Sequence, residues 1–208
     1  MHRATFDALV ADLVPRANSV AIVDPSLLAD AQRTGPATAS VSRRIGTALE
    51  ALRDAGAEVV VCTCSTIAGE AAAQGTARSV PVVRVDQPMA EAAVGHGPRL
   101  AVVAALASAL GPTIESIEQA AEARGCVVET SEHLVAGAWA LFAAGDLPGY
   151  LEAVAAACRR VVGSSDAIVL AQASMADVAA MVDLHVPVLS SPRLAVQAAA
   201  QRLAPDRR

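Results

Sequence analysis

The sequence predicts an α/β fold in which parallel sheets are covered by helices on both faces. Short apolar runs alternate with longer segments of helical periodicity along the chain of 208 residues. Most of these runs are apolar throughout, as buried strands of parallel sheets are, and do not alternate with polar residues. One strand–loop–helix pattern also occurs twice, which predicts two similar halves of the molecule.

The first half of the chain contains three predicted strands. Apolar residues at Val41, Ile45 and Leu49 have the spacing of a helix face, and Gly56 marks the end of that helix. In chain order we expect a helix over residues 4–13, a buried strand over 20–23 that ends at Asp24-Pro25, a helix over 40–54, a strand over 58–62, an alanine-rich helix, and a strand over 81–85.

The second half continues the alternation with four further strands. We expect strands over residues 100–105, 126–128, 167–171 and 187–189, and helices over residues 112–124, 151–162 and 192–203. Most acidic residues and arginines fall on the helices, which is typical of solvated helix faces.

The repeated pattern includes residues 58–68 and residues 166–176. In each copy an acidic residue enters an apolar strand, the strand ends in a loop with a hydroxyl residue, and a helix follows; Thr66 and Ser174 are these hydroxyl residues. A Val-Pro pair then opens the next strand. The repeat predicts two pseudo-symmetric lobes, and ligands of parallel α/β folds bind beyond the carboxyl ends of the strands. We therefore expect Cys64 and Gln172 on opposite sides of one cleft, an arrangement that suits proton transfer on the two faces of a flat intermediate.

Composition excludes several classes of function. All 16 basic residues are arginine, so a P-loop nucleoside triphosphatase and Schiff-base catalysis are excluded, because both need a lysine. One Trp, one Tyr and two Phe cannot form a surface on which bases stack. A net charge of −5 also differs from the positive charge of nucleic-acid-binding proteins, so we expect no nucleic-acid partner. No apolar run is long enough to cross a membrane, and no signal peptide is visible. Four cysteines in such a chain indicate reduced thiols and a cytoplasmic location.

Cys64 is the cysteine with the best position for chemistry. It leaves a strand and precedes Ser65 and Thr66 at the expected start of a helix, where amide groups and the helix dipole stabilise a thiolate. The same amides and hydroxyls suit a carboxylate ligand. Cys62, Cys126 and Cys158 are interpreted as small core residues. No histidine or second cysteine pair has metal-ligand spacing, so we expect no metal.

Four segments of the sequence resemble the aspartate/glutamate racemase superfamily, over nearly the whole chain. They are Val61-Cys-Thr-Cys64-Ser-Thr, Pro81-Val-Val-Arg-Val-Asp86-Gln-Pro-Met-Ala, Leu170-Ala-Gln-Ala-Ser-Met-Ala176 and Pro187-Val-Leu-Ser-Ser-Pro-Arg193. The first looks like the motif of the family's first catalytic cysteine, and the third looks like the motif of its second.

The resemblance implies two flavodoxin-like lobes related by a pseudo-twofold axis, with the active site between them. The first lobe would comprise residues 1–93 and 191–208, without the strand that opens it in other members, and the second would comprise residues 94–190. The family acts without metal or organic cofactor on small amino or carboxylic acids, by two cysteines that flank the substrate's α-carbon. The resemblance also implies a homodimer.

The sequence departs from the family pattern at the second cysteine position, which Gln172 occupies. Glutamine neither donates nor removes a proton at a useful pKa, so three functions stay open: a cysteine-dependent isomerase or racemase, a single-cysteine decarboxylase or lyase, and a non-catalytic protein that binds a small acid. Cys64 would be the acid/base or nucleophilic residue. The expected substrate-binding residues are Ser65, Thr66, Ser108, Thr113, Ser174, Asp24 and Ser190.

Overall fold

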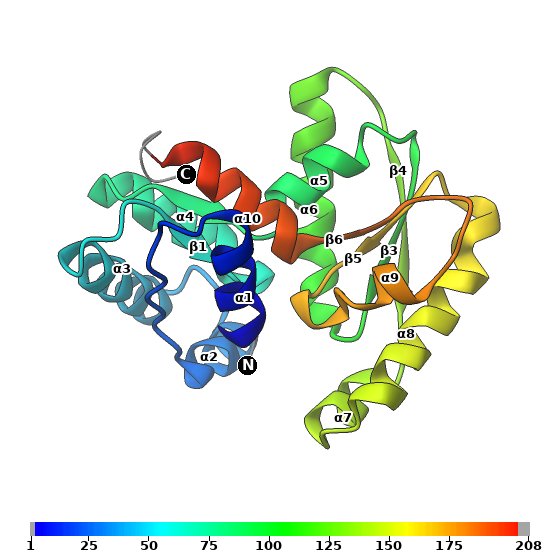
Figure 1. Cartoon of the computed structure of the whole chain (residues 1–208), viewed down its shortest axis with the longest axis horizontal. Helices are drawn as coiled ribbons and strands as arrows, with labels where there is room; N and C mark the ends of the chain where they lie inside the picture. Colours follow the sequence, from blue (N-terminus) through cyan, green and yellow to red (C-terminus); the bar gives the residue numbers. More distant parts are fainter. Residues whose placement is uncertain (1–2, 204–208) are drawn as a thin grey trace. The chain divides into compact units, whose positions relative to one another are not determined.

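The structure is a computed structural model that describes residues 3–203. The chain forms two compact units (Figure 1). Unit 1 comprises the chain up to Val85 and the C-terminal segment from Pro192, and unit 2 runs from Asp86 to Ser191. The sequence-based boundary assigned residues 86–93 to the first lobe, whereas helix α5 (Gln87–Ala93) packs on strands and a helix of unit 2.

Unit 1 is built on a small parallel sheet. Strand β1 (Val60–Cys62) pairs with β2 (Val82–Arg84), and Val60 lies opposite Val82. The helices of this unit are α1 (Arg3–Leu13), α2 (Pro25–Thr34), α3 (Ala39–Asp54), α4 (Ser65–Arg78) and α10 (Ser191–Arg202).

The core of unit 1 follows from the helical spacing seen in the sequence. Val41, Ile45 and Leu49 of α3 are buried together with residues of α2 and α4, and side chains of both strands pack against them. Helix α10 is held to α1 by an ion pair between Arg193 and Asp12, with 3.0 Å between nitrogen and oxygen. Its Arg202 guanidinium donates to the carbonyl of Val82 at 2.8 Å, so the C-terminal helix is tied to the sheet.

Unit 2 contains a four-stranded parallel sheet in the order β4-β3-β5-β6. The strands are β3 (Arg99–Ala104), β4 (Glu129–Leu134), β5 (Ala167–Leu170) and β6 (Val188–Ser190). The helices besides α5 are α6 (Leu110–Arg124), α7 (Ala138–Ala143), α8 (Leu147–Val161) and α9 (Val178–Met181), with short 3₁₀ segments at η1 (Ala107–Ala109), η2 (Val162–Ser164) and η3 (Ala173–Met175).

The central strands of unit 2 are buried on both faces. Ala101, Val103, Ile168 and Leu170 pack against α8 in one apolar cluster. Because side chains alternate across a strand, the residues between them face the other side, where α5 and α6 lie (Figure 1). Helices therefore cover both faces of the sheet, as the uninterrupted apolar runs predict.

Most predicted elements are confirmed, and two strand predictions are wrong. Residues 20–23 form no strand; Val20, Ile22 and Val23 are 60%, 48% and 58% exposed, because no neighbouring strand pairs with this segment. Residues 126–128 are also irregular, and the strand begins three residues later as β4. Four of its six side chains are exposed, since β4 is an edge strand, so its sequence has no apolar run.

Some helices were not anticipated at all. The sequence has only weak signals for α2, α5 and α7, which have between six and ten residues, whereas the repeated pattern did predict a helix after Ser174, where α9 lies. No helix among residues 3–203 is long and apolar enough to cross a membrane.

Candidate active site

Cys64 lies at the junction between the end of β1 and the start of α4. It is the N-cap residue of α4, with an extended backbone at φ −117° and ψ 109°. Its carbonyl accepts a hydrogen bond from the amide of Ile67 at 3.2 Å and from the Cys62 thiol at 3.7 Å. The thiol is half-buried. The backbone therefore fixes Cys64 where the first amides of a helix favour a negative charge.

Two hydroxyl residues follow Cys64 in the first turn of α4. Ser65 and Thr66 are both half-buried, and the hydroxyl of Ser65 has no hydrogen-bond partner within residues 3–203. The first amide groups of a helix have no partner inside the helix. Thiol, hydroxyls and amides thus gather at one strand end, and this set of groups suits a small carboxylate.

Gln172 leaves β5 and is held by the loop after β3. Its Oε1 accepts hydrogen bonds from the backbone amides of Ala105 at 2.7 Å and Leu106 at 2.9 Å. The Nε2 group has no partner among the described residues. The side chain is consequently fixed by its oxygen and presents two N–H donors. The sequence contains no signal for these two amides, because any residue other than proline can supply a backbone N–H group.

The residues around Gln172 lie at the carboxyl edge of the sheet of unit 2. Ser190 ends β6 opposite Leu170, which precedes Gln172 by two residues. Ser108 lies in η1, just after β3. Ser174 shares a hydrogen bond of 2.6 Å with Tyr150, whose ring is fully buried and whose pKa is raised by that burial. Tyr150, the only tyrosine of the chain, therefore supports Ser174 from the core.

Thr113 and Asp24 already have their polar groups engaged. Thr113 is completely buried in α6, and its hydroxyl donates to the carbonyl of Ala109 at 2.7 Å. A hydroxyl in this position cannot reach a ligand without rearrangement of the helix. Asp24 is the N-cap of α2 and accepts hydrogen bonds from the amides of Ser26 and Leu27.

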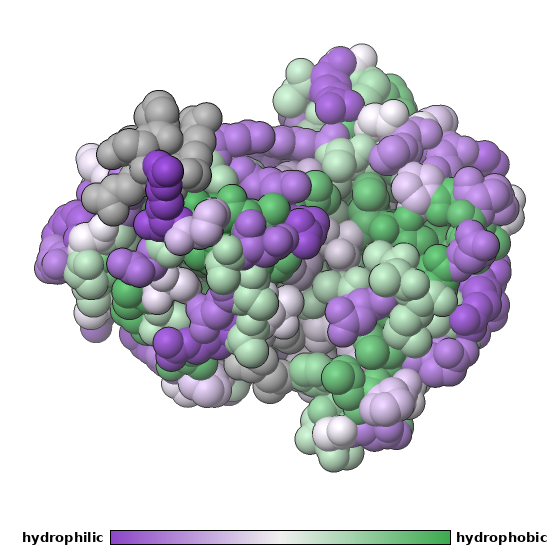
Figure 2. Space-filling view, in the orientation of Figure 1, coloured by the Kyte–Doolittle hydropathy of each residue, from purple (hydrophilic) through white to green (hydrophobic). Residues whose placement is uncertain are grey.

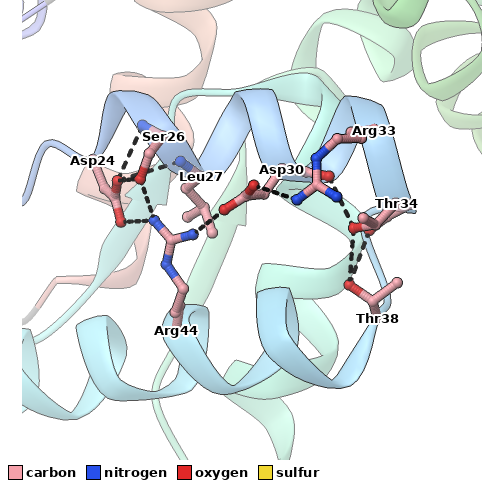
Figure 3. A network of polar contacts seen from close by, with 9 residues as sticks. Asp24, Ser26, Leu27, Asp30, Arg33, Thr34, Thr38 and Arg44 are labelled. Atoms are coloured by element: carbon pink, nitrogen blue, oxygen red, sulfur yellow. Dashed lines mark hydrogen bonds and ion pairs between the residues drawn. The ribbon is translucent and has the colours of Figure 1, made fainter.

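Asp24 also belongs to a surface network between α2 and α3 (Figure 3). Arg44 contacts Asp24 and donates to Asp30 at 2.6 Å. Hydrogen bonds from Ser26 and Arg44 hold the pKa of Asp24 below its ordinary value. The geometry is that of a helix cap reinforced by an ion pair, and it gives Asp24 a structural role.

Residues 3–199 match the sequence profile of the Asp/Glu/Hydantoin racemase family. The chain belongs to this family. Among curated protein sequences, none matches the chain. No group of three His, Cys, Asp or Glu side chains within the described part of the racemase-family chain could hold a metal ion.

Solved structures of racemases share the fold of this racemase-family protein. A glutamate racemase from Bacillus anthracis is similar with a TM-score of 0.67 at 18% identity, covering 95% of this chain and 76% of that one. A structure described as an Asp/Glu racemase from Yersinia pestis gives 0.67 at 20% identity, with coverage of 96% and 91%. An allantoin racemase from Klebsiella pneumoniae gives 0.63 at 21% identity, with coverage of 95% and 80%.

The two strand ends of this racemase-family chain offer different chemistry. The end of β1 carries a thiol that can take up and release a proton. The end of β5 carries an amide that can only donate and accept hydrogen bonds. Each strand end by itself thus supplies one part of proton-transfer chemistry: an acid/base group at the end of β1 and a fixed hydrogen-bond donor at the end of β5.

Proposed function

We propose that this racemase-family protein is a cofactor-independent isomerase or lyase that acts on a small amino acid or carboxylic acid with one acid/base cysteine, Cys64. The observation that carries the proposal is the contrast between Cys64, placed at the start of α4, and Gln172, whose oxygen is held by two amides. Membership of the family supports proton transfer at a carbon beside a carboxylate.

A single thiol can exchange a proton with only one face of the substrate's α-carbon. In a decarboxylation, the bond between the α-carbon and a carboxylate breaks, carbon dioxide leaves, and the electron pair remains as an enolate-like anion. The thiol of Cys64 then gives its proton to the α-carbon and becomes a thiolate, which water reprotonates. In an isomerisation, the Cys64 thiolate instead adds to one carbon of a carbon–carbon double bond beside a carboxylate, and the π electron pair moves onto the neighbouring carbon as an enolate-like anion. After rotation about the resulting single bond, that pair reforms the double bond and the thiolate leaves. Symmetric racemisation would need a second acid, which Gln172 is not.

Hydrogen-bond donors would stabilise the enolate-like anion. Gln172 is suited to this because its oxygen is already bound and its Nε2 group remains available. Ser65 and Ser190 have hydroxyls without partners among residues 3–203, so they are the next candidates for contact with a carboxylate. The proposal requires Cys64 and Gln172 to meet the same substrate.

Proton exchange in D₂O tests the proposal. Candidate amino acids and dicarboxylic acids are incubated with the protein, and loss of the α-proton or turnover is followed by NMR. We expect Cys64→Ser to lower the rate by about 10²–10⁴-fold, the usual contribution of a general acid or base. Cys126→Ser is the matched control, since Cys126 is exposed and lies outside this site. Exchange that survives Cys64→Ser unchanged would sink the proposal.

A second function, binding of a small acid without catalysis, is favoured by the presence of Gln172 at the second cysteine position. Thermal unfolding separates the two functions. Stabilisation by a carboxylate that persists in Cys64→Ser, together with no exchange and no turnover in the parent protein, identifies a binding protein.

The family resemblance also supports a homodimer that acts in the cytoplasm. Sedimentation of the purified protein tests the dimer directly, and a monomer at all concentrations would contradict it.

A further inference from the structure

A groove between α5 and α6 of unit 2 forms a cavity of about 360 Å³. This volume lies in the range of small-molecule pockets. Gln87 and Glu91 of α5 line it on one side, and Ser116, Gln119 and Arg124 of α6 line it on the other. Two alanines of α6 complete the wall, and their small side chains leave the groove open. The lining positions of α6 recur at intervals of three to four residues, at 116, 119–120 and 123–124, so they share one helix face.

Ser116 provides the first sign that the groove binds a ligand. It is only 2% exposed, and its hydroxyl oxygen has no hydrogen-bond partner among the described residues. Buried polar groups are nearly always paired, so this unpaired hydroxyl needs an explanation. Thr113, one turn earlier in α6, uses the ordinary alternative of donating to a carbonyl four residues back. Ser116 lines the groove, and neither the donor nor the acceptor of its hydroxyl is used among the described residues.

Arg124 provides the cation of the groove. Its guanidinium forms no hydrogen bond or ion pair within the part of the chain that the structure describes. Arg44, Arg78 and Arg99, in contrast, each have a carboxylate partner. The Nη1 atom of Arg124 lies so close to Gly95, just after α5, that an added Cβ would be 3.0 Å from it. The absence of a side chain at Gly95 therefore leaves room for this cation beside the groove.

The two charges of the groove determine the class of ligand. Glu91 supplies a carboxylate, and one of its oxygens accepts from Nε2 of Gln87 at 2.9 Å. Arg124 supplies a guanidinium, and no ion pair joins it to Glu91 among the described residues. A dianion would be repelled by Glu91, and a dication would be repelled by Arg124. A molecule with one positive and one negative group can satisfy both.

We propose that the α5–α6 groove of unit 2 binds a small zwitterion, with its carboxylate on Arg124, its ammonium group on Glu91 and a further polar group at Ser116. Ser116 and Arg124 are eight residues apart, which is roughly 12 Å along the helix axis. The ligand is thus the size of an amino acid with a polar side chain or of a dipeptide. The site uses neither Cys64 nor Gln172, so it is separate from the proposed reaction.

Calorimetric titration with free glutamine tests the site, with succinate as the dianionic comparison. The Cys64→Ala variant is used throughout, so that turnover does not contribute heat. We expect glutamine to bind, and Ser116→Ala and Arg124→Gln each to weaken binding by about tenfold or more. Glu91→Gln is expected to weaken glutamine binding and to strengthen succinate binding. Glu122→Gln, an exposed position of α6 outside the groove, is the matched control and leaves both unchanged.

A stability measurement accompanies the titration. Ser116→Ala removes an unpaired buried hydroxyl, so the free variant should unfold at the same temperature as the parent or a higher one, and the same concentration of glutamine should stabilise it less than the parent. Arg124 is exposed, so Arg124→Gln is expected to fold normally. Failure of glutamine to bind, or equal binding in the parent and in both groove variants, would overturn the proposal.

Discussion

The ends of β1 and β5 hold equivalent positions in a repeated strand–loop–helix pattern, yet the polar residues at these two ends have different surroundings. Cys64 caps α4 through its backbone, and its thiol remains half-buried. Gln172 is followed by a 3₁₀ turn instead of a long helix, and its side chain is bound to the loop after β3. One strand end therefore carries a group for proton transfer, and the other carries a group fixed for hydrogen bonding.

The sheets behind these two strand ends also differ. The strand β5 has β3 and β6 as neighbours, and all four of its residues are fully buried. The strand β1 pairs with β2, and its three residues are only partly buried. The strand that leads to Gln172 is thus more completely buried than the strand that leads to Cys64. Substitutions that compare the two units test this difference.

The largest expected effect is a difference in the free energy of unfolding between substitutions in the two sheets. Val169→Ala, in the buried centre of β5, should lower the free energy of unfolding by about 2–3 kcal/mol, because two methyl groups are lost and a cavity remains. Val61→Ala, in the centre of β1, should cost clearly less, since Val61 is only partly buried. Urea unfolding of both variants measures the difference, and equal losses would contradict it.

The next effect concerns the amide clamp on Gln172. Gln172→Leu removes the acceptor of two backbone amides, and we expect it to lower the free energy of unfolding by about 1–3 kcal/mol. Gln172→Glu is the matched control, because a carboxylate still accepts from both amides while the Nε2 donors are lost. If Gln172→Glu keeps the stability of the parent but loses substrate binding, the side-chain oxygen of Gln172 stabilises the fold and its Nε2 group binds the substrate. A Leu variant as stable as the parent would show that the clamp contributes nothing.

A smaller effect is expected at the pair of Tyr150 and Ser174. Tyr150→Phe and Ser174→Ala should each lower the free energy of unfolding by about 0.5–1.5 kcal/mol, since each leaves a hydroxyl without its partner or removes one hydrogen bond. The double variant should lose less than the sum of the two, because both changes remove the same bond. Strict additivity in thermal or urea unfolding would argue against a shared hydrogen bond.

The smallest effect concerns the surface network of Asp24, Asp30 and Arg44. Hydrogen bonds from Ser26 and Arg44 lower the pKa of Asp24 from 3.8, and those from Arg33 and Arg44 lower the pKa of Asp30. A lowered pKa in the folded state stabilises the protein above the unfolded-state value, and this contribution disappears as pH falls through the folded-state value. Arg44→Gln should therefore be slightly less stable than the parent at neutral pH, and the difference should shrink in acid. A difference that is constant with pH would exclude these carboxylates as its source.

The comparison also shows which features a sequence can reveal. Strands such as β3 and β5 were predicted because a central strand buried on both faces must be apolar throughout. Residues 20–23 have the same appearance but no pairing partner, and pairing is a non-local property that an apolar run does not report. The edge strand β4 escaped prediction because solvent exposure permits polar residues there.

The candidate site was predictable where a side chain carries the chemistry. Cys64 was predicted as the reactive residue because a thiol before a helix has a recognisable sequence context, and its position at the start of a helix is confirmed. The engagement of Thr113 with Ala109 and the amides of Ala105 and Leu106 could not be predicted, because they depend on rotamers and backbone positions. The role of Asp24 as a helix cap is signalled by Pro25 after it, although its contact with Arg44 arises only from the packing of α2 on α3.

Competition among the four thiols tests the central role of Cys64 most directly. Cys126 is exposed, Cys62 and Cys64 are half-buried, and burial raises the pKa of the Cys158 thiol to about 11. Limiting iodoacetamide at neutral pH, followed by mass spectrometry of peptides, gives the order of alkylation. We predict that Cys64 reacts first despite its partial burial, since the start of α4 favours its thiolate, and that Cys158 reacts last. An order that follows exposure alone, with Cys126 ahead of Cys64, would contradict the assignment of Cys64 as the acid/base group.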